Sequence, residues 1–166
     1  MSLGAFKMRP EGSCVSDLQL RVIRTQSEMA DALAVRRAVF IAEQGVSEAE
    51  EIDGYDEDPA QVTDALHVIA YVDGRAVATG RLLLVGGPGE NPRIGRVAVL
   101  REYRGHGYGQ SVMIALEQEA RRRRYPGITL AAQLPVIPFY ERLGYGARGE
   151  IFVEANIEHR WMDRRF

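Results

Sequence analysis

The chain has 166 residues, enough for one domain with a substantial core, because a chain of about 150 residues buries roughly two-thirds of its unfolded surface. A net charge of -2 with 46% hydrophobic residues is typical of an ordinary globular protein and argues against a nucleic-acid-binding chain, which carries a basic excess. Cys14 is the only cysteine, which excludes an intramolecular disulfide and a thiolate zinc cluster, so we expect a cytoplasmic protein.

Residues 1–16 have no hydrophobic periodicity and are rich in glycine and small polar residues. We expect them to form a flexible arm in front of a single domain that spans residues 17–166. No apolar run approaches the roughly 18 residues that a membrane-spanning helix needs, and the N-terminus lacks the apolar stretch of a signal peptide. The expected partners therefore include no membrane.

The first elements of the domain are predicted from residue periodicity. Residues 18–25 alternate as a strand does, and residues 27–44 carry apolar side chains at helical spacing, with Ser27 as the expected N-cap. Residues 48–61 are strongly acidic. We interpret this run mainly as a solvated loop, with attraction of a cationic amine as the alternative.

The remaining elements alternate strands and helices. Residues 65–85 predict two strands joined at Asp73-Gly74, a strong hairpin signal. Then follow a turn (86–92), a strand (93–100), a glycine-rich turn, a helix to about Arg124, a strand (128–132), a second helix and two closing strands. This order predicts a single mixed α/β (α+β) layer fold.

Glycine stands at every second position from Gly105 to Gly109, directly before a helical pattern. A Walker A loop would need Gly-Lys-Ser/Thr, but Gln110 and Ser111 follow Gly109. A dinucleotide fingerprint would need a third glycine further on, which is absent. Glycines before a helix still let the backbone approach an anion, and the free N–H groups of the first helical turn favour it.

The pattern Arg104-x-x-Gly107-x-Gly109 resembles the acyl-CoA signature of the GNAT superfamily of N-acetyltransferases, Arg/Gln-x-x-Gly-x-Gly/Ala. The resemblance implies that acetyl-CoA is the cosubstrate. It implies that the strand before the turn pairs with the pantetheine arm and that the turn holds the diphosphate. The implied cofactor-binding residues are Arg96, Val97, Ala98, Val99, Arg104, Gly105, His106, Gly107, Tyr108, Gly109, Gln110, Gln133, Phe139 and Tyr140.

Further motifs resemble the ElaA-type branch of this superfamily over roughly residues 18–165: RRAVFIAEQGV, EIDGYD, AQ ahead of FYERLGYGARGEIF, and IEHRWM. The resemblance implies a central, mostly antiparallel twisted sheet of about six to seven strands flanked by helices. The sequence departs from the branch at Ser47, at residues 156–159 and in the length of the acidic run. These departures fall near the expected acceptor side, so the resemblance specifies the cosubstrate better than the acceptor.

The implied activity is transfer of an acetyl group from acetyl-CoA to the primary amine of a small molecule or peptide, by direct attack in a ternary complex and without a metal. The oligomeric state is open, with a homodimer as one option. Two alternatives are an acyl-homoserine-lactone-synthase-like acyltransferase and a CoA-binding sensor without turnover. The full Arg-x-x-Gly-x-Gly turn argues against the first, and only a turnover assay separates the second.

Three side chains are candidates for the chemistry. Tyr140 matches the family tyrosine near the CoA sulfur, where its hydroxyl can donate to the departing thiolate. Glu43 and His159 are the candidate general bases, and His159 needs no special environment because the pKa of histidine is about 6.5. Glu154 or a chain of waters is the alternative base. A backbone N–H around Val99 is the expected oxyanion donor.

Overall fold

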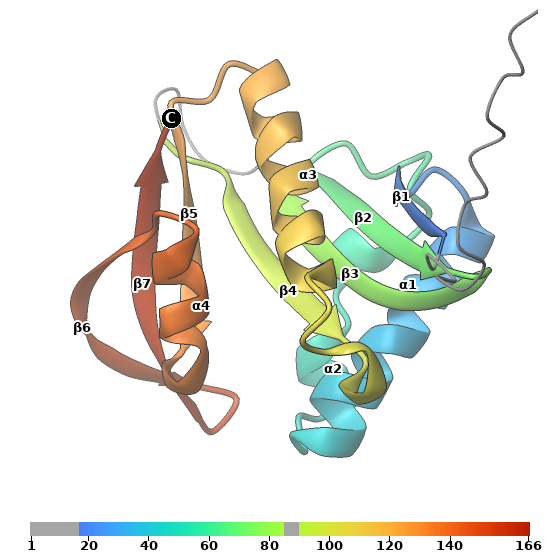
Figure 1. The fold of residues 1–166 in the computed structure, drawn as a ribbon, viewed down its shortest axis with the longest axis horizontal. Helices are drawn as coiled ribbons and strands as arrows, with labels where there is room; N and C mark the ends of the chain where they lie inside the picture. Colours follow the sequence, from blue (N-terminus) through green and yellow to red (C-terminus); the bar gives the residue numbers. More distant parts are fainter. Residues whose placement is uncertain (1–16, 85–89) are drawn as a thin grey trace, which may run out of the picture.

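The computed structural model describes residues 17–84 and 90–166. The expected arm at 1–16 and residues 86–89 of the expected turn lie outside the described residues. The described residues form a seven-stranded sheet in the order β1-β2-β3-β4-β5-β7-β6 (Figure 1). Its strands are β1 (Leu18–Val22), β2 (Ala65–Val72), β3 (Arg75–Leu83), β4 (Arg93–Val99), β5 (Gly127–Gln133), β6 (Gly146–Glu154) and β7 (Ile157–Arg165).

Four α-helices and four short helical segments accompany these strands in the described part of the chain. The α-helices are α1 (Gln26–Arg36), α2 (Glu48–Glu51), α3 (Tyr108–Arg122) and α4 (Ile137–Arg142). The other segments are a π-helical one, η1 (Arg37–Glu43), and three 3₁₀ turns, η2 (Gly54–Asp56), η3 (Arg101–Tyr103) and η4 (Leu134–Val136).

All neighbouring strands described here are antiparallel except β4 and β5, which are parallel. The β4–β5 pairing covers only Arg93 with Thr129 and Ile94 with Leu130. Beyond these residues the two strands diverge (Figure 1). The predicted mixed and mostly antiparallel fold is therefore confirmed, and the sheet is open on one side of β4.

The predicted hairpin between β2 and β3 is also confirmed. Asp73 and Gly74 both have positive φ, 48° and 80°, as a two-residue turn of type I′ requires. Glycine and aspartate tolerate that conformation better than most residues, so the turn fixes the register of two long central strands.

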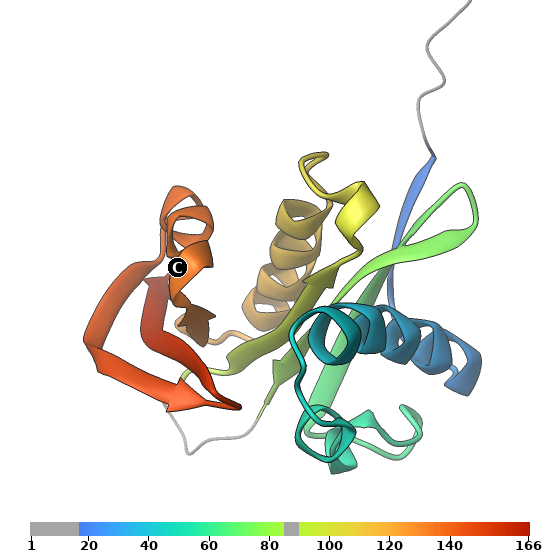
Figure 2. The same ribbon diagram turned by 90° about the horizontal axis from the view of Figure 1, so that it is seen from below.

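Helices cover both faces of the sheet (Figure 2). On one face α3 buries Val112, Met113, Leu116 and Ala120 against the strands. A Cβ atom on Gly80 of β3 would lie 2.8 Å from side-chain atoms of both Val112 and Leu116, so glycine lets α3 approach the sheet closely. On the opposite face α1 packs Met29 and Ala32 on the sheet.

The first helix begins earlier than the sequence pattern indicated. The N-cap is Thr25 and not Ser27: the Thr25 hydroxyl accepts from the Glu28 N–H, and the Glu28 carboxylate accepts from the Thr25 N–H. This reciprocal pair is the capping box that Ser/Thr-x-x-Glu predicts. Within residues 17–84 and 90–166, no helix combines the length and apolarity needed to cross a bilayer.

Candidate active site

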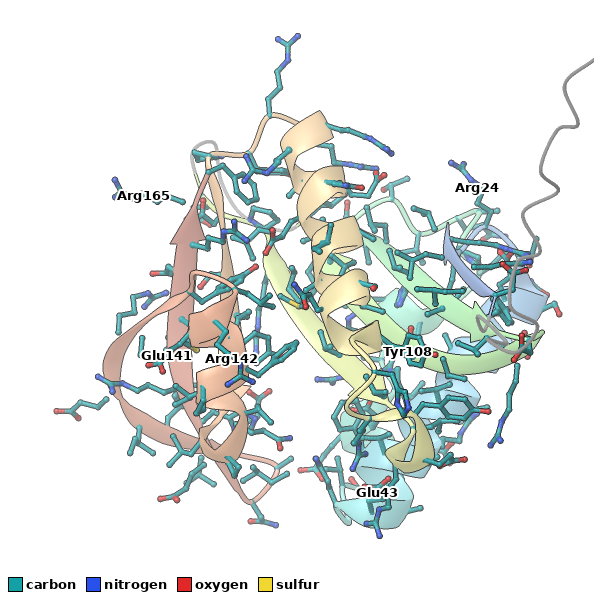
Figure 3. All side chains as sticks on the ribbon, in the orientation of Figure 1. Arg24, Glu43, Tyr108, Glu141, Arg142 and Arg165 are labelled. Carbon is teal, nitrogen blue, oxygen red and sulfur yellow. The ribbon has the colours of Figure 1, made fainter. Side chains whose placement is uncertain are left out.

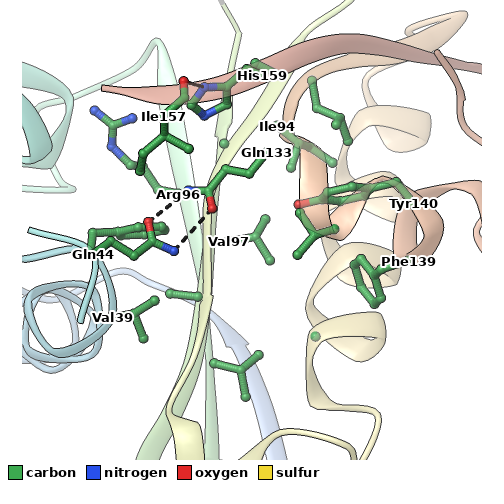
Figure 4. A pocket seen from close by; sticks show the side chains of 18 of the residues that line it. Val39, Gln44, Ile94, Arg96, Val97, Gln133, Phe139, Tyr140, Ile157 and His159 are labelled. Carbon is green, nitrogen blue, oxygen red and sulfur yellow. Dashed lines mark hydrogen bonds between the residues drawn. The ribbon is translucent and has the colours of Figure 1, made fainter. Parts of the chain in front are cut away.

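A cavity of about 930 Å³ opens where β4 and β5 diverge (Figure 4). Its walls come from β4 and β5, from η1 and α2, from the glycine turn and start of α3, from α4, and from the β6–β7 turn. Of the predicted site residues, these line it: Arg96, Val97, Ala98, Val99, Arg104, Gly105, Gly107, Tyr108, Gly109, Gln110, Gln133, Phe139, Tyr140 and His159.

The edge of β4 presents backbone groups to this cavity. The N–H of Leu100 donates to the carbonyl of Val77 on β3 at 2.9 Å. Two residues before Leu100, Ala98 pairs with Thr79 on β3. Because N–H groups alternate along a strand, those of Val97 and Val99 point away from β3. They point toward the side on which β5 diverges from β4, so an extended ligand bound there can form hydrogen bonds with them.

The glycine turn follows the C-terminal end of β4, after η3. Gly105 and Gly107 have φ of 79° and 84°, a region that glycine adopts without strain, and Gly107 is the N-cap of α3. Ser111 is the first residue whose N–H reaches back into the turn, donating to the Gly107 carbonyl at 3.0 Å. The N–H groups of the first helical turn are left without an intrahelical partner, which makes this end of α3 suited to an anion.

Arg104 connects this turn to β4 and to η1. Its Nε donates to the Val99 carbonyl at 3.0 Å, and its Nη2 lies 3.0 and 3.1 Å from the two carboxylate oxygens of Glu43. Arg101 reaches the same carboxylate at 3.5 Å. Glu43, a candidate general base, is therefore ion-paired beside the glycine turn (Figure 3) and is not among the residues that line the cavity.

His106 also differs from the expectation that it contacts the cosubstrate. Its Nδ1 lies 3.0 Å from the Arg104 carbonyl and its ring stacks on Tyr108, so the side chain folds back onto its own turn. It does not line the cavity. The backbone of His106 remains part of the glycine turn, between Gly105 and Gly107.

Tyr140 of α4 is 9% exposed and lines the cavity (Figure 4). Its ring makes edge contacts with Phe139 and Tyr145, whose centroids lie 5.0 and 6.0 Å away. No group in the described residues hydrogen-bonds to its hydroxyl. Burial raises the pKa of Tyr140 to about 12. The hydroxyl is thus protonated at neutral pH and has its hydrogen bond free for a ligand.

His159 of β7 lines the cavity near the start of the strand. Its Nδ1 lies 2.8 Å from the Ile157 carbonyl, and its ring stacks on Phe152. Because a carbonyl only accepts, Nδ1 carries the proton, and in the neutral ring Nε2 is then an acceptor. Glu154 lines the same side and lies 3.6 Å from Arg93.

A pair of amides crosses the cavity and was not predicted. The side-chain amide of Gln44, just after η1, donates from Nε2 to Oε1 of Gln133 at 3.2 Å. Nε2 of Gln133 donates in turn to Oε1 of Gln44 at 2.9 Å (Figure 4). The two residues are 89 positions apart in the chain. No local pattern in the sequence could have paired them, although Gln133 itself was expected to contact the cosubstrate.

The acidic run differs most from the sequence interpretation. Glu51 and Asp56 are only 3% and 6% exposed, so this part of the run is not a solvated loop. The guanidinium of Arg36, itself 1% exposed, bonds both carboxylates at 2.6 Å. Arg81 binds Asp53 at 2.8 Å and Asp56 at 3.1 Å. Arg96 pairs with Glu51 at 3.1 Å. We call these residues the buried ion-pair network: Arg36, Glu51, Asp53, Asp56, Arg81 and Arg96.

Burial and charge act differently on two carboxylates of the network: burial raises the pKa of Glu51, whereas the pKa of Asp56 is lowered. Burial alone would raise the pKa of Asp56, but the hydrogen bonds and charge of Arg36 bring it down to about 2. The same burial lowers the pKa of His67, whose Nε2 lies 2.9 Å from the Tyr55 carbonyl, to about 4. Among the described residues, no group of three or more His, Cys, Asp or Glu side chains is arranged to hold a metal ion.

Comparison with known proteins gives consistent matches. The model of the acetyltransferase (GNAT) protein family matches residues 32–145 of the sequence. The Bacillus subtilis protein YyaT is 32% identical over 147 residues, covering 89% of this chain and 95% of that protein. The crystal structure of Escherichia coli ElaA superposes with a TM-score of 0.78 at 26% identity, covering 90% of this chain and all of ElaA. An acyl-CoA N-acyltransferase from Pseudomonas aeruginosa superposes with a TM-score of 0.76 at 32% identity, covering 89% and 99%.

Proposed function

This chain belongs to the acetyltransferase (GNAT) family, and on that premise we propose that it transfers an acetyl group from acetyl-CoA to the primary amine of a small molecule or peptide. The amine attacks directly while both substrates are bound. One observation carries this proposal: a single cavity joins the glycine-capped start of α3 to an unpaired strand edge and a free tyrosine hydroxyl. Acetyl-CoA supplies the activated acyl group as a thioester.

The residues at the start of α3 fit a diphosphate. Space for an anion exists at Gly105 and Gly107, because a Cβ at either position would meet no atom within 4 Å. At Gly109 a Cβ would lie 3.4 Å from Val99 and 3.5 Å from Phe139, so this position is more closely packed than the other two. We propose that the N–H groups from Gly105 to Gln110 hold the diphosphate, and that Arg104 keeps their turn in place.

The unpaired edge of β4 fits the pantetheine arm, which carries amide groups of its own. The N–H of Val97 and Val99 would pair with that arm or with the thioester carbonyl, and Gln133 on β5 would contact it from the facing strand. We propose that the Val99 N–H stabilises the negative charge that develops on the carbonyl oxygen during attack. A fixed backbone donor suits this task because it needs no reorganisation.

Tyr140 is proposed to assist departure of the thiolate. In the transfer a bond forms between the amine nitrogen and the carbonyl carbon, the carbon–sulfur bond breaks, and the sulfur gains a proton as the nitrogen loses one. A phenol with a pKa of about 12 keeps its proton more firmly than a thiol with a pKa near 8.5. Tyr140 therefore acts chiefly as a hydrogen-bond donor to sulfur, and the proton that the sulfur gains is the one that the amine releases, passed on by the base through water.

His159 is proposed as the group that accepts the amine proton. Its Nδ1 proton is engaged with Ile157, which directs the acceptor role to Nε2. Glu43 was the other candidate, but its carboxylate is held by two arginines beside the glycine turn. We therefore propose a supporting role for Glu43 and keep Glu154 as the second candidate base.

The test is turnover with a panel of amines. Purified protein is incubated with acetyl-CoA and polyamines, amino acids or short peptides, while free thiol and acetylated product are measured by absorbance and mass spectrometry. The proposal predicts equal amounts of thiol and acetylated amine with at least one class. Tight acetyl-CoA binding without product across the panel would favour a sensor, and absence of binding would refute the proposed cosubstrate.

A further inference from the structure

The middle of β4 contains a backbone conformation that arginine seldom adopts. The register of β3 and β4 skips one position there, so that Arg96 and Val97 together lie opposite Gly80. This is a β-bulge, and Arg96 within it has a φ of 54°. A residue with a side chain loses about 1–2 kcal/mol in this left-handed region. Such a conformation persists only where its surroundings hold it.

The side chain of Arg96 is held by the end of α2. Its Nε lies 3.1 Å from a carboxylate oxygen of Glu51 and donates to the Glu51 carbonyl at 3.1 Å. Its Nη2 donates to the Glu50 carbonyl at 3.1 Å. Three oxygens of one short segment thus bind one guanidinium, so the position of Arg96 depends on the position of Glu51.

Glu51 is itself fixed by the buried ion-pair network. Arg36 binds its carboxylate at 2.6 Å through Nε and its carbonyl at 2.6 Å through Nη2. The same guanidinium also donates to both carboxylate oxygens of Asp56, from Nη1 at 2.6 Å and from Nη2 at 2.9 Å. The Glu51 carboxylate is not free to bind a cationic amine substrate, because Arg36 and Arg96 already pair with it. The network is therefore built to hold α2 against β4 and not to bind a free amine.

The bulge lies directly before the two N–H groups that face the cavity, those of Val97 and Val99. A bulge re-aims the groups that follow it, because it shifts the alternation of the strand by one residue. Glu51, Arg96, Val97 and Val99 all border the same cavity. A change at Glu51 can therefore reach the strand edge through Arg96.

We propose that Glu51 is a positioning residue for acetyl transfer: through Arg96 it holds the β4 bulge in the conformation that turns the N–H groups of Val97 and Val99 toward the acyl donor. The inference rests on the proposed function. It assigns to the acidic run a task inside the transfer reaction, and it explains why an arginine occupies a position that suits glycine.

The test uses acetyl-CoA labelled with carbon-13 at its carbonyl, bound to the wild-type protein. A hydrogen bond from the bulge polarises this carbonyl and moves its NMR signal downfield of free acetyl-CoA. Arg96→Ala and Glu51→Gln are expected to lose most of that displacement while retaining CoA binding by calorimetry. Arg96→Gly is expected to retain more of it than Arg96→Ala, because glycine adopts the bulge conformation without strain, which favours that conformation roughly 5- to 30-fold.

Glu48→Gln is the matched control, since Glu48 lies in the same helix and pairs with Arg37 at the surface. It should leave the signal unchanged. If Arg96→Ala and Arg96→Gly both keep the wild-type signal, or both lose it equally, the bulge is not held in this way. The two Arg96 variants decide the matter even if Glu51→Gln does not fold. Wild-type protein that binds no acetyl-CoA would instead refute the proposed function.

Discussion

Acid should destabilise this protein through His67 in a pH range where Asp56 is still ionised. His67 is 3% exposed and lies beside Asp56, Arg36 and Arg81. Burial lowers its pKa to about 4, whereas the unfolded chain has a histidine pKa of about 6.5. Between these values the unfolded state binds the proton and the folded state does not, so stability falls as pH falls from about 6.5 to 4. The gap corresponds to about 3 kcal/mol.

The assay is equilibrium urea unfolding at several pH values from 7.5 down to 4, for the wild type and for His67→Gln. Glutamine can still donate to the Tyr55 carbonyl but does not titrate, so the variant should lose the extra acid sensitivity and become relatively more stable as pH falls. His106→Gln, at an exposed histidine, should behave as the wild type does. Equal pH dependence of wild type and His67→Gln would show that His67 is not held neutral by burial. Asp56 adds its own loss only below about pH 4, as pH approaches its folded pKa of about 2.

Three further predictions concern the site and its support. Gly107→Glu should abolish the stabilisation that CoA at 100 times its Kd confers, about 2.7 kcal/mol, whereas Gly107→Ala carries the same backbone strain and should keep most of it in a thermal-shift assay. Tyr140→Phe should lower kcat roughly 10- to 1000-fold with unchanged CoA binding, since its hydroxyl has no partner to lose in the described fold; wild-type kcat under rate-limiting chemistry would remove it from the mechanism. Gly80→Ala should cost about 1–3 kcal/mol in urea unfolding, because its Cβ would press on Val112 and Leu116, and an unchanged midpoint would mean that α3 can move away freely.

Local signals in the sequence were sufficient for much of the framework. The Asp73-Gly74 turn and the glycine turn before α3 both depend on backbone conformations that few residues adopt, and both occur where expected. The N-cap at Thr25 was missed although its signature is local, since Glu28 stands three residues later. That error came from reading apolar spacing before capping chemistry.

The acidic run could not be interpreted correctly from local sequence. Seven acidic residues in eleven positions indicate a solvated loop on charge alone. Which of them are buried depends on arginines contributed by α1, β3 and β4, up to 45 residues away. A similar limit applies to the amide pair of Gln44 and Gln133, because both depend on how distant elements pack.

The bulge at Arg96 accounts for two features of the site together. The parallel pairing of β4 with β5 stops at Ile94, and the bulge follows within two residues. Because a bulge bends its strand and increases the local twist, β4 turns away from β5 at that point and the cavity opens. The same irregularity re-aims the N–H groups of Val97 and Val99 into the opened space. An opening without re-aimed donors would leave the thioester carbonyl without a backbone hydrogen bond, and re-aimed donors beside a paired β5 would be occupied by that strand. Both conditions are met by one residue held in a strained conformation, which is why its anchor in the buried ion-pair network matters for chemistry as well as for stability.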